Sequence, residues 1–275
     1  MEQLNKIEAI KYLGISAKDF DNYFKLSKEI KGFKRGVRWF FDKSFLKDWL
    51  LMRKERTVYL DLSEYEKCFE FAIKMVYGGL SLHGIRGERS EVQAADDVIL
   101  GILAEHAIKK FLKKKFGIEI KLDEEVHTAY ITPQDFIAIK DKNNFRKPKL
   151  GVGVKASKMK NAYLVLGSNE AEFKERKSDV YIFARVGLPT DHLFRILRDH
   201  SFFKNVKDAL EKDGLSRKIN TFEDVPVWIC GFVYYDELEK VTEIPNQKFD
   251  GHRYVKSVAK MHNSDKEWEG MLKKL

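Results

Sequence analysis

The chain has 275 residues, enough for two domains, because single domains usually span about 100–200 residues. Its 51 lysines and arginines exceed its 42 aspartates and glutamates, and the net charge of +9 favours a polyanionic partner. No run of about 18 apolar residues occurs, which excludes a membrane-spanning helix, and the first residues lack the apolar core of a signal peptide. Cys68 and Cys230 lie inside apolar stretches, which indicates reduced thiols in a cytoplasmic protein with no membrane partner.

Two short helices separated by a glycine turn are predicted at the beginning of the chain. Residues 6–13 (KIEAIKYL) carry apolar side chains at helical spacing, and Gly14 follows where a helix end favours a left-handed residue. Ser16 has the position of an N-cap for a second helix, with Asp19 three residues later. Helix, tight turn and helix form the outline of a DNA-binding motif.

A β-hairpin and a third helix are predicted next. Gly36 lies between basic residues of an alternating stretch, and Asp42 would cap the helix that follows. This order of elements over residues 6–50 resembles the excisionase or MerR-like helix-turn-helix family, so we expect a winged helix-turn-helix domain at 1–55. The resemblance implies DNA contacts from exposed polar residues of the second helix and the wing, namely Lys18, Asn22, Lys34, Arg35 and Arg38. The alternative is a three-helix unit whose aromatic residues all belong to a core.

Residues 56–275 are predicted to form a larger domain with a mixed β-sheet flanked by helices, of class α/β or α+β. One helix should begin at Ser63, with Glu66 completing its cap, and a second, at about 94–116, should end at Gly117. The predicted strands are 118–123, 128–140, 149–157, 162–167, 179–188 and 225–235.

Three side chains of the larger domain are candidates for phosphodiester hydrolysis. Glu105 lies among apolar residues of its helix, where burying a carboxylate costs several kcal/mol unless a cation compensates it. Asp135 begins or occupies one strand, and Lys155 occupies another, so a hairpin could bring them together. Carboxylates can hold Mg²⁺, which activates water, and an ammonium group can offset the developing charge. The Val154 carbonyl would offer a further oxygen ligand.

The order of a helix with Glu, a PxD strand and a strand ending in xxK resembles the PD-(D/E)xK nuclease superfamily. Segments throughout 63–270 also resemble type II restriction endonucleases, such as ILGILAEHAIKKF and KSDVYIFARVGLP. The resemblance implies that Asp135 and Glu105 bind Mg²⁺ and that Lys155 positions the attacking water.

The chain departs from the family pattern at Gly153, where an aspartate or glutamate is usual two residues before the lysine. The segment NEAEFKERK offers Glu170, Glu172 and Glu175 as replacements, and we prefer Glu172. Alternatively, Glu105 alone completes the site, or the site is inactive.

Other polar residues near these strands have weaker roles in this interpretation. Lys140 is a poor catalytic lysine, because its odd offset from Asp135 would point it to the opposite face of the strand. Asp141 begins a polar turn, and Asp179 is expected to cap a turn rather than bind metal. The residues that follow the lysine strand would face the phosphate backbone or form a solvated basic turn: Ser157, Lys158, Lys160 and Asn161.

The sequence therefore predicts a Mg²⁺-dependent, sequence-specific endonuclease of the type II restriction kind acting on double-stranded DNA. Cutting two antiparallel strands at a symmetric site needs two active sites, so a homodimer with twofold symmetry is expected. Two alternatives remain open: a non-catalytic DNA-binding regulator, and a structure-selective repair or junction nuclease.

Overall fold

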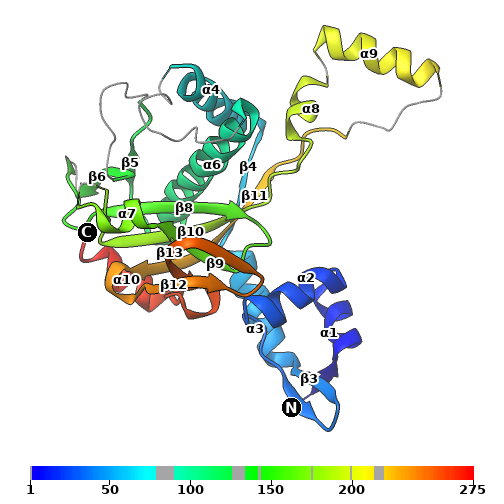
Figure 1. Cartoon of the computed structure of the whole chain (residues 1–275), viewed down its shortest axis with the longest axis vertical. Coiled ribbons are helices and arrows are strands. Elements are labelled where there is room, and N and C mark those ends of the chain that lie inside the picture. Colours follow the sequence, from blue (N-terminus) through cyan, green and yellow to red (C-terminus); the bar gives the residue numbers. More distant parts are fainter. Residues whose placement is uncertain are drawn as a thin grey trace.

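The computed structural model describes residues 2–78, 90–125, 134–141, 144–174, 176–198, 200–213 and 220–275. Within these ranges the protein is a mixed α and β structure in which helices flank several sheets (Figure 1). None of the described helices is long and apolar enough to cross a membrane. The proline of the PxD motif, Pro133, and one of the three candidate glutamates, Glu175, lie outside the described residues.

The two predicted N-terminal helices are present and have the predicted ends. Helix α1 (Lys6–Leu13) ends at Gly14, whose φ of 64° is in the left-handed region. The Oγ atom of Ser16 accepts the Asp19 amide at 3.0 Å, which caps helix α2 (Ala17–Asp21). Helix α2 continues into a turn of π-helix, η1 (Asn22–Leu26).

A small antiparallel sheet accompanies these helices, with strands in the order β1 (Gln3–Asn5), β3 (Arg38–Asp42) and β2 (Phe33–Arg35). Arg35 pairs with Arg38 across a tight turn in which Gly36 has a φ of 61°. Asp42 caps helix α3 (Lys43–Glu55) by accepting the Ser44 amide at 3.0 Å. We refer to residues 2–55 as the N-terminal module.

Four strands form a mixed central sheet in the order β4 (Thr57–Leu60), β11 (Val225–Tyr234), β10 (Val180–Val186) and β8 (Val152–Lys158). Strands β8 and β10 are parallel, and the other neighbours are antiparallel. Every residue of β10 is buried, because both faces of the sheet are covered.

Two helices cover one face of the central sheet, α4 (Leu62–Gly78) and α6 (Glu91–Phe116). Helix α6 ends at Gly117, which has the predicted left-handed conformation with a φ of 68°. The predicted start of α4 was wrong. Asp61 caps this helix and exchanges hydrogen bonds with Glu64, at 2.9 and 3.0 Å.

The N-terminal module packs against the opposite face of the central sheet. Its buried side chains, including Tyr23 and Trp49, form one apolar cluster with Tyr181, Phe183 and Trp228 of β10 and β11. Because neighbouring residues on a strand alternate between faces, Ile182 and Ala184 join the helix-covered core instead. The module is therefore fixed to the sheet by a shared core.

The remaining elements form two further sheets and several short helices. Strands β5 (Ile120–Leu122), β6 (Phe136–Asp141) and β7 (Asn144–Arg146) make one antiparallel sheet. Strands β12 (Glu239–Ile244), β13 (Gln247–Ser257) and β9 (Tyr163–Gly167) make the other. The short helices are α7 (Ser168–Glu172), α8 (His192–Leu197), α9 (Ser201–Lys212), η2 (Tyr235–Glu237), η3 (Val258–Lys260) and α10 (Asp265–Leu272), of which α8 and α9 extend away from the sheets (Figure 1).

Candidate active site

Asp135 is fixed beside strand β8 by two backbone contacts. Its amide donates to the Val152 carbonyl at 3.0 Å, and its Oδ2 atom accepts the amide of Val154. The predicted hairpin is not the cause of this approach, because β6 begins one residue after Asp135 and pairs with β5 and β7. The Asp135 side chain nevertheless contacts Val154, the residue before Lys155 on β8.

Lys155 lies in the middle of β8 and forms an ion pair with Glu170 of helix α7, with 2.5 Å between Nζ and Oε1. Both side chains are about 30% exposed, so solvent reaches the pair. Burial alone would lower the pKa of Lys155, but the charges of Glu170 and Asp135 raise it above its usual value. The ammonium group therefore keeps its charge at neutral pH.

Glu105 of helix α6 interacts electrostatically with Asp135 and Lys155. Burial raises its pKa well above the usual value, repulsion from Asp135 adds to this, and the charge of Lys155 opposes it. Burial also raises the pKa of Asp135, against the opposing effects of Lys155 and the Val154 amide. The two carboxyl groups thus repel each other in a partly buried site, where an additional cation would stabilise their ionised forms.

The structure brings Glu170, rather than the preferred Glu172, to Lys155. Consecutive helical residues are rotated by about 100°, so residues two apart in α7 point in nearly opposite directions. Glu172 is exposed, and its Oε1 atom accepts hydrogen bonds from His252 (2.9 Å), Lys240 (3.0 Å) and Tyr254 (2.9 Å). These bonds lower the pKa of Glu172 to about 2.

The packing around Gly153 leaves little room for a side chain at this position of β8. A Cβ atom at this position would lie 2.8 Å from Ser178 Oγ and 3.0 Å from a ring carbon of Tyr181. Side chains two apart on a strand share a face, so an acidic residue here would have to fit between these groups and Lys155. Glu170 places a carboxylate beside the lysine without using this space.

A cavity of about 370 Å³ opens next to Glu105, which forms part of its wall. Its other lining residues come from α4, α6 and the segment after β5: Lys67, Glu70, Phe71, Lys74, Ile102, His106, Asp123 and Glu124. Glu105 is therefore reached from this cavity, whereas Asp135, Lys155 and Glu170 do not line it.

The acidic residues can be compared with the needs of Mg²⁺. Within the described ranges, no three His, Cys, Asp or Glu side chains are grouped so as to hold a metal ion. Mg²⁺, however, commonly takes one or two carboxylates and completes its coordination with water and phosphate oxygens. Asp135 and Glu105 fit that requirement because they repel each other, and Lys155, whose charge lowers both of their pKa values, is already in contact with Glu170. The Val154 amide donates to Asp135, and the role of its carbonyl as a further metal ligand stays a prediction.

The predicted DNA-contacting residues of the N-terminal module are mostly exposed. Lys18, Lys34, Arg35 and Arg38 have exposed side chains, whereas Asn22 is partly buried. Two cations of the β2–β3 hairpin lie over aromatic rings: Lys34 Nζ is 5.4 Å from the ring centre of Trp39, and the Arg35 guanidinium is 5.5 Å from that of Phe33. Such contacts reduce the freedom of the cations while leaving them accessible.

The residues after Lys155 form a closed turn at the end of β8. The Asn161 amide donates to the Lys158 carbonyl at 3.0 Å, and its side chain donates to Ser157. Lys158 and Lys160 are exposed at this turn, a position open to an anionic partner.

Three polar residues that the sequence analysis did not assign to the site have partners elsewhere. Lys140 pairs with Glu119 at 3.0 Å, and Asp141 with Arg146 at 3.1 Å. Asp179 accepts the Gly151 amide at 2.7 Å, so it caps the start of the neighbouring strand.

The candidate active site therefore consists of Glu105, Asp135, Lys155 and Glu170. Three of these four residues were expected from the sequence, and Glu170 was considered but not preferred. Comparison with protein-family models, characterised proteins and solved structures found no match to the chain.

Proposed function

We propose that the protein is a Mg²⁺-dependent endonuclease that cuts double-stranded DNA at specific sequences, in the manner of a type II restriction enzyme. The observation that carries this proposal is the position of Asp135, whose carboxylate accepts the amide of Val154, the residue before Lys155 on β8. Partly buried acidic groups beside a charged lysine are the components that metal-assisted phosphodiester hydrolysis requires.

Each residue of the site has a defined part in this proposal. Asp135 and Glu105 would hold Mg²⁺, which when bound polarises the scissile phosphate and acidifies water. Lys155 would orient the attacking water and offset negative charge on the phosphate. Glu170 would hold the ammonium group in place through its ion pair.

The N-terminal module supplies the proposed means of reading DNA. Helices α1 and α2, the hairpin and α3 follow one another as in a winged helix-turn-helix, with exposed cations on α2 and the wing. Phosphate neutralisation by Lys and Arg gives affinity, and base contacts in the grooves give specificity. Cleavage of both strands would need two copies of the site, so we propose a twofold homodimer as the active form.

The test is cleavage of unmodified plasmid DNA by the full chain in Mg²⁺, with EDTA as the metal-free arm. We expect discrete fragments from the wild type and a loss of at least about 100-fold from Asp135→Ala and Lys155→Ala. Matched controls are Asp141→Ala and Lys140→Ala, because these residues are paired outside the site. Equal cutting by all variants would exclude the site.

A second candidate function is a DNA-binding regulator without catalytic activity. The Lys155–Glu170 ion pair favours it, because a charged lysine already paired with a carboxylate attracts a phosphate less strongly. This alternative predicts specific duplex binding without cleavage in Mg²⁺ or Mn²⁺ and unchanged binding by Asp135→Ala. A structure-selective nuclease would instead cut branched DNA in preference to linear duplex of any sequence.

A further inference from the structure

A short loop beside the candidate active site connects helix α7 to strand β10. We refer to residues 173–177, described except at position 175, as the α7 loop. Helix α7, which carries Glu170, ends immediately before it. At its other end, the Lys177 carbonyl accepts the side-chain amide of Gln134 at 3.2 Å, and Gln134 precedes Asp135 in the chain. Both ends of the loop are thus tied to segments that carry residues of the site.

The α7 loop is held in a fixed shape. Before it, the Oε1 atom of Glu172 accepts three hydrogen bonds from β12 and β13. At its end, Lys177 Nζ lies 3.4 Å from the ring centre of Tyr235. The amides of Arg176 and Lys177 both donate to the Phe173 carbonyl, at 2.9 and 3.0 Å, which closes a tight turn.

Phe173 is the exposed apolar residue of this turn. Its side chain is 55% exposed, although phenylalanine is among the residues most often buried, and it joins none of the apolar clusters formed by described residues. A single exposed apolar residue has no meaning by itself, so its neighbours decide its role. Lys174 and Arg176 are exposed in the same turn, and neither forms an ion pair with another described residue. The loop thus presents an aromatic ring together with two cations.

This combination matches the way in which proteins deform duplex DNA. Apolar side chains such as phenylalanine insert between base steps and unstack them, while lysine and arginine contact the phosphates nearby. We propose that the α7 loop is a DNA wedge, an inference that rests on the proposed nuclease function. Phe173 inserts at a base step next to the scissile phosphate, and Lys174 and Arg176 contact the adjacent phosphates. Because pyrimidine–purine steps unstack most easily, the wedge favours such a step near the cut.

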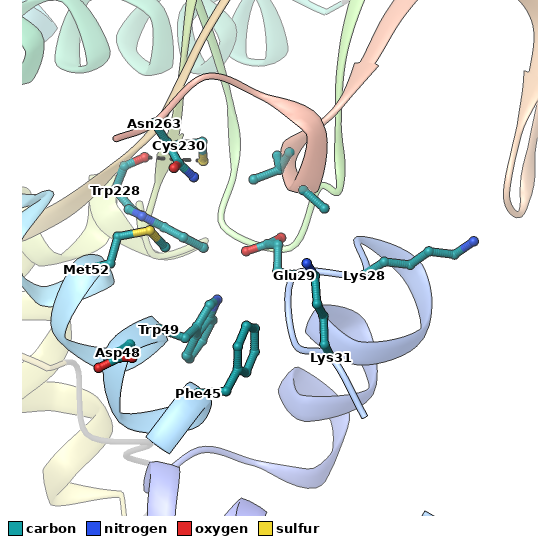
Figure 2. A pocket seen from close by; sticks show the side chains of 12 residues that line it. Lys28, Glu29, Lys31, Phe45, Asp48, Trp49, Met52, Trp228, Cys230 and Asn263 are labelled. Atoms are coloured by element: carbon teal, nitrogen blue, oxygen red, sulfur yellow. Dashed lines mark hydrogen bonds between the residues drawn. The ribbon is translucent and has the colours of Figure 1, made fainter. Parts of the chain in front are cut away.

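The α7 loop and the wing are separate elements. Figure 1 shows α7 beside β8 and away from β3, which forms part of the wing. The module that carries the wing is held by its own contacts, because Trp49 and Met52 of α3 pack with Trp228 of β11 (Figure 2). Variants of the loop and of the wing therefore test different contacts with DNA.

The first experiment probes base stacking in plasmid DNA bound to the full chain, in EDTA and with Ca²⁺ in place of Mg²⁺. Permanganate and diethyl pyrocarbonate modify unstacked thymines and purines, and primer extension locates the modified bases. We expect reactive bases with the wild type and a return to the level of naked DNA with Phe173→Ala. Phe173→Leu should keep part of the reactivity, because leucine also acts as a wedge. The matched control is Phe194→Ala on α8, where the side chain is 54% exposed.

The second experiment measures duplex binding by fluorescence anisotropy. Phe173→Ala should weaken binding about tenfold, because it removes the contact between the ring and a base. Joint replacement of Lys174 and Arg176 by alanine should lower the slope of log affinity against log salt by about 2. Its control is the joint replacement of Lys114 and Lys266, two exposed lysines on other elements. Circular dichroism establishes that each variant is folded.

Three results would overturn the wedge. The first is a wild-type complex in which every base is as unreactive as in naked DNA. The second is reactivity that persists in Phe173→Ala. The third is a dimer that Phe173→Ala converts to a monomer in sedimentation, which would place the ring in a subunit interface. Failure of the nuclease proposal is distinguishable, because a wild type that unstacks bases through Phe173 but cuts no plasmid in Mg²⁺ would exclude cleavage alone.

Discussion

Arg185 of strand β10 and Glu29 of the N-terminal module form a buried ion pair, with 2.8 Å between Nη2 and Oε1. Their side chains are only 1% and 5% exposed. The pair therefore joins the module to the strand that lies beside β8 in the central sheet.

Loss of one partner of this pair should strongly destabilise the fold. Arg185→Met leaves the Glu29 carboxylate buried without its cation, and we expect a loss of about 3–5 kcal/mol in the free energy of unfolding. Urea denaturation measures this loss. The control is Lys74→Met, which breaks an exposed ion pair with Glu70 and should cost less than about 1 kcal/mol. Similar losses for both variants would contradict the structural role assigned to Arg185.

Gly153→Ala should also destabilise the protein, because its Cβ atom would meet Ser178 Oγ at 2.8 Å. We expect a loss of about 1–3 kcal/mol, measured by urea denaturation. Gly101→Ala is the matched control, since a Cβ atom there has no neighbour within 4 Å and alanine favours helix α6. A Gly153→Ala variant as stable as the wild type would contradict the crowding described at this position.

Glu170 and Glu172 provide a paired test of the catalytic proposal. Glu170→Gln removes the charge that holds Lys155, so we expect the rate of DNA cleavage to fall by about tenfold or more. Glu172→Gln changes only contacts with β12 and β13, and cleavage should stay within about twofold of the wild type. Single-turnover cleavage in Mg²⁺ measures both rates, and the reverse order of effects would restore Glu172 as the catalytic residue.

The wing cations should control the salt dependence of DNA binding. Joint replacement of Lys34, Arg35 and Arg38 by alanine should reduce the slope of log affinity against log salt by about 2–3, because each phosphate contact contributes about 0.9. Fluorescence anisotropy with a labelled duplex at several salt concentrations measures the slope. An unchanged slope would remove the wing from the DNA interface. The charge-matched control replaces three exposed lysines outside the module, Lys114, Lys266 and Lys273.

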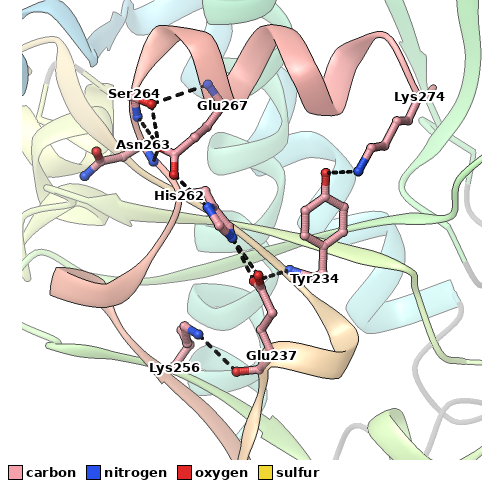
Figure 3. A network of polar contacts seen from close by, with 8 residues as sticks. All are labelled: Tyr234, Glu237, Lys256, His262, Asn263, Ser264, Glu267 and Lys274. Carbon is pink, nitrogen blue, oxygen red and sulfur yellow. Dashed lines mark hydrogen bonds and ion pairs between the residues drawn. The ribbon is translucent and has the colours of Figure 1, made fainter.

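His262 predicts a pH dependence of stability. Its ring nitrogens lie 2.7 Å from Glu237 and 2.8 Å from Glu267 of helix α10 (Figure 3). Burial alone would lower the pKa of His262, but these hydrogen bonds raise it above 6.5. The resulting stabilisation is fully present below the unfolded-state pKa and is lost as pH rises through the folded-state pKa.

The corresponding measurement compares wild type and His262→Gln by urea denaturation at about pH 5.5 and about pH 8.5. The free energy of unfolding should be higher for the wild type than for the variant at the lower pH. This difference should be about 1 kcal/mol larger there than at the higher pH. Lys260→Gln is the control, because this nearby lysine does not titrate in the range, and its effect should be the same at both values. A larger effect of His262→Gln at the higher pH would contradict the predicted sign.

The features that sequence predicted well are those fixed by local chemistry. Gly14 and Gly117 end helices because they accept a left-handed conformation, and Ser16 and Asp42 cap helices through bonds to nearby amides. The start of α4 was missed because Asp61 and Ser63 both have a glutamate three residues later. Strand β4 ends at Leu60, so Asp61 is the next residue and takes the cap position. The end of this strand depends on tertiary structure, which the local sequence pattern does not contain.

The candidate site likewise has features that local sequence predicts and features that depend on tertiary structure. Asp135 and Lys155 could be proposed as partners from their residue types, although the approach of Asp135 to the side of β8 depends on sheet topology. The choice between Glu170 and Glu172 depends on the orientation of α7 after β9, which spacing within the segment does not specify. The crowding of Gly153 comes from Ser178, which is distant in the sequence, so the local pattern around Gly153 could not predict it.

The shared core of the N-terminal module and the central sheet has a geometric consequence for the proposed nuclease. Tyr23 and Trp49 of the module pack directly against Trp228 of the central sheet. Arg35 of the module and Lys155 of the sheet therefore belong to one packed body. A duplex read by the wing would thus meet the cutting residues at a constant spacing. Cleavage products would carry ends at one defined number of base pairs from the bases that the module reads.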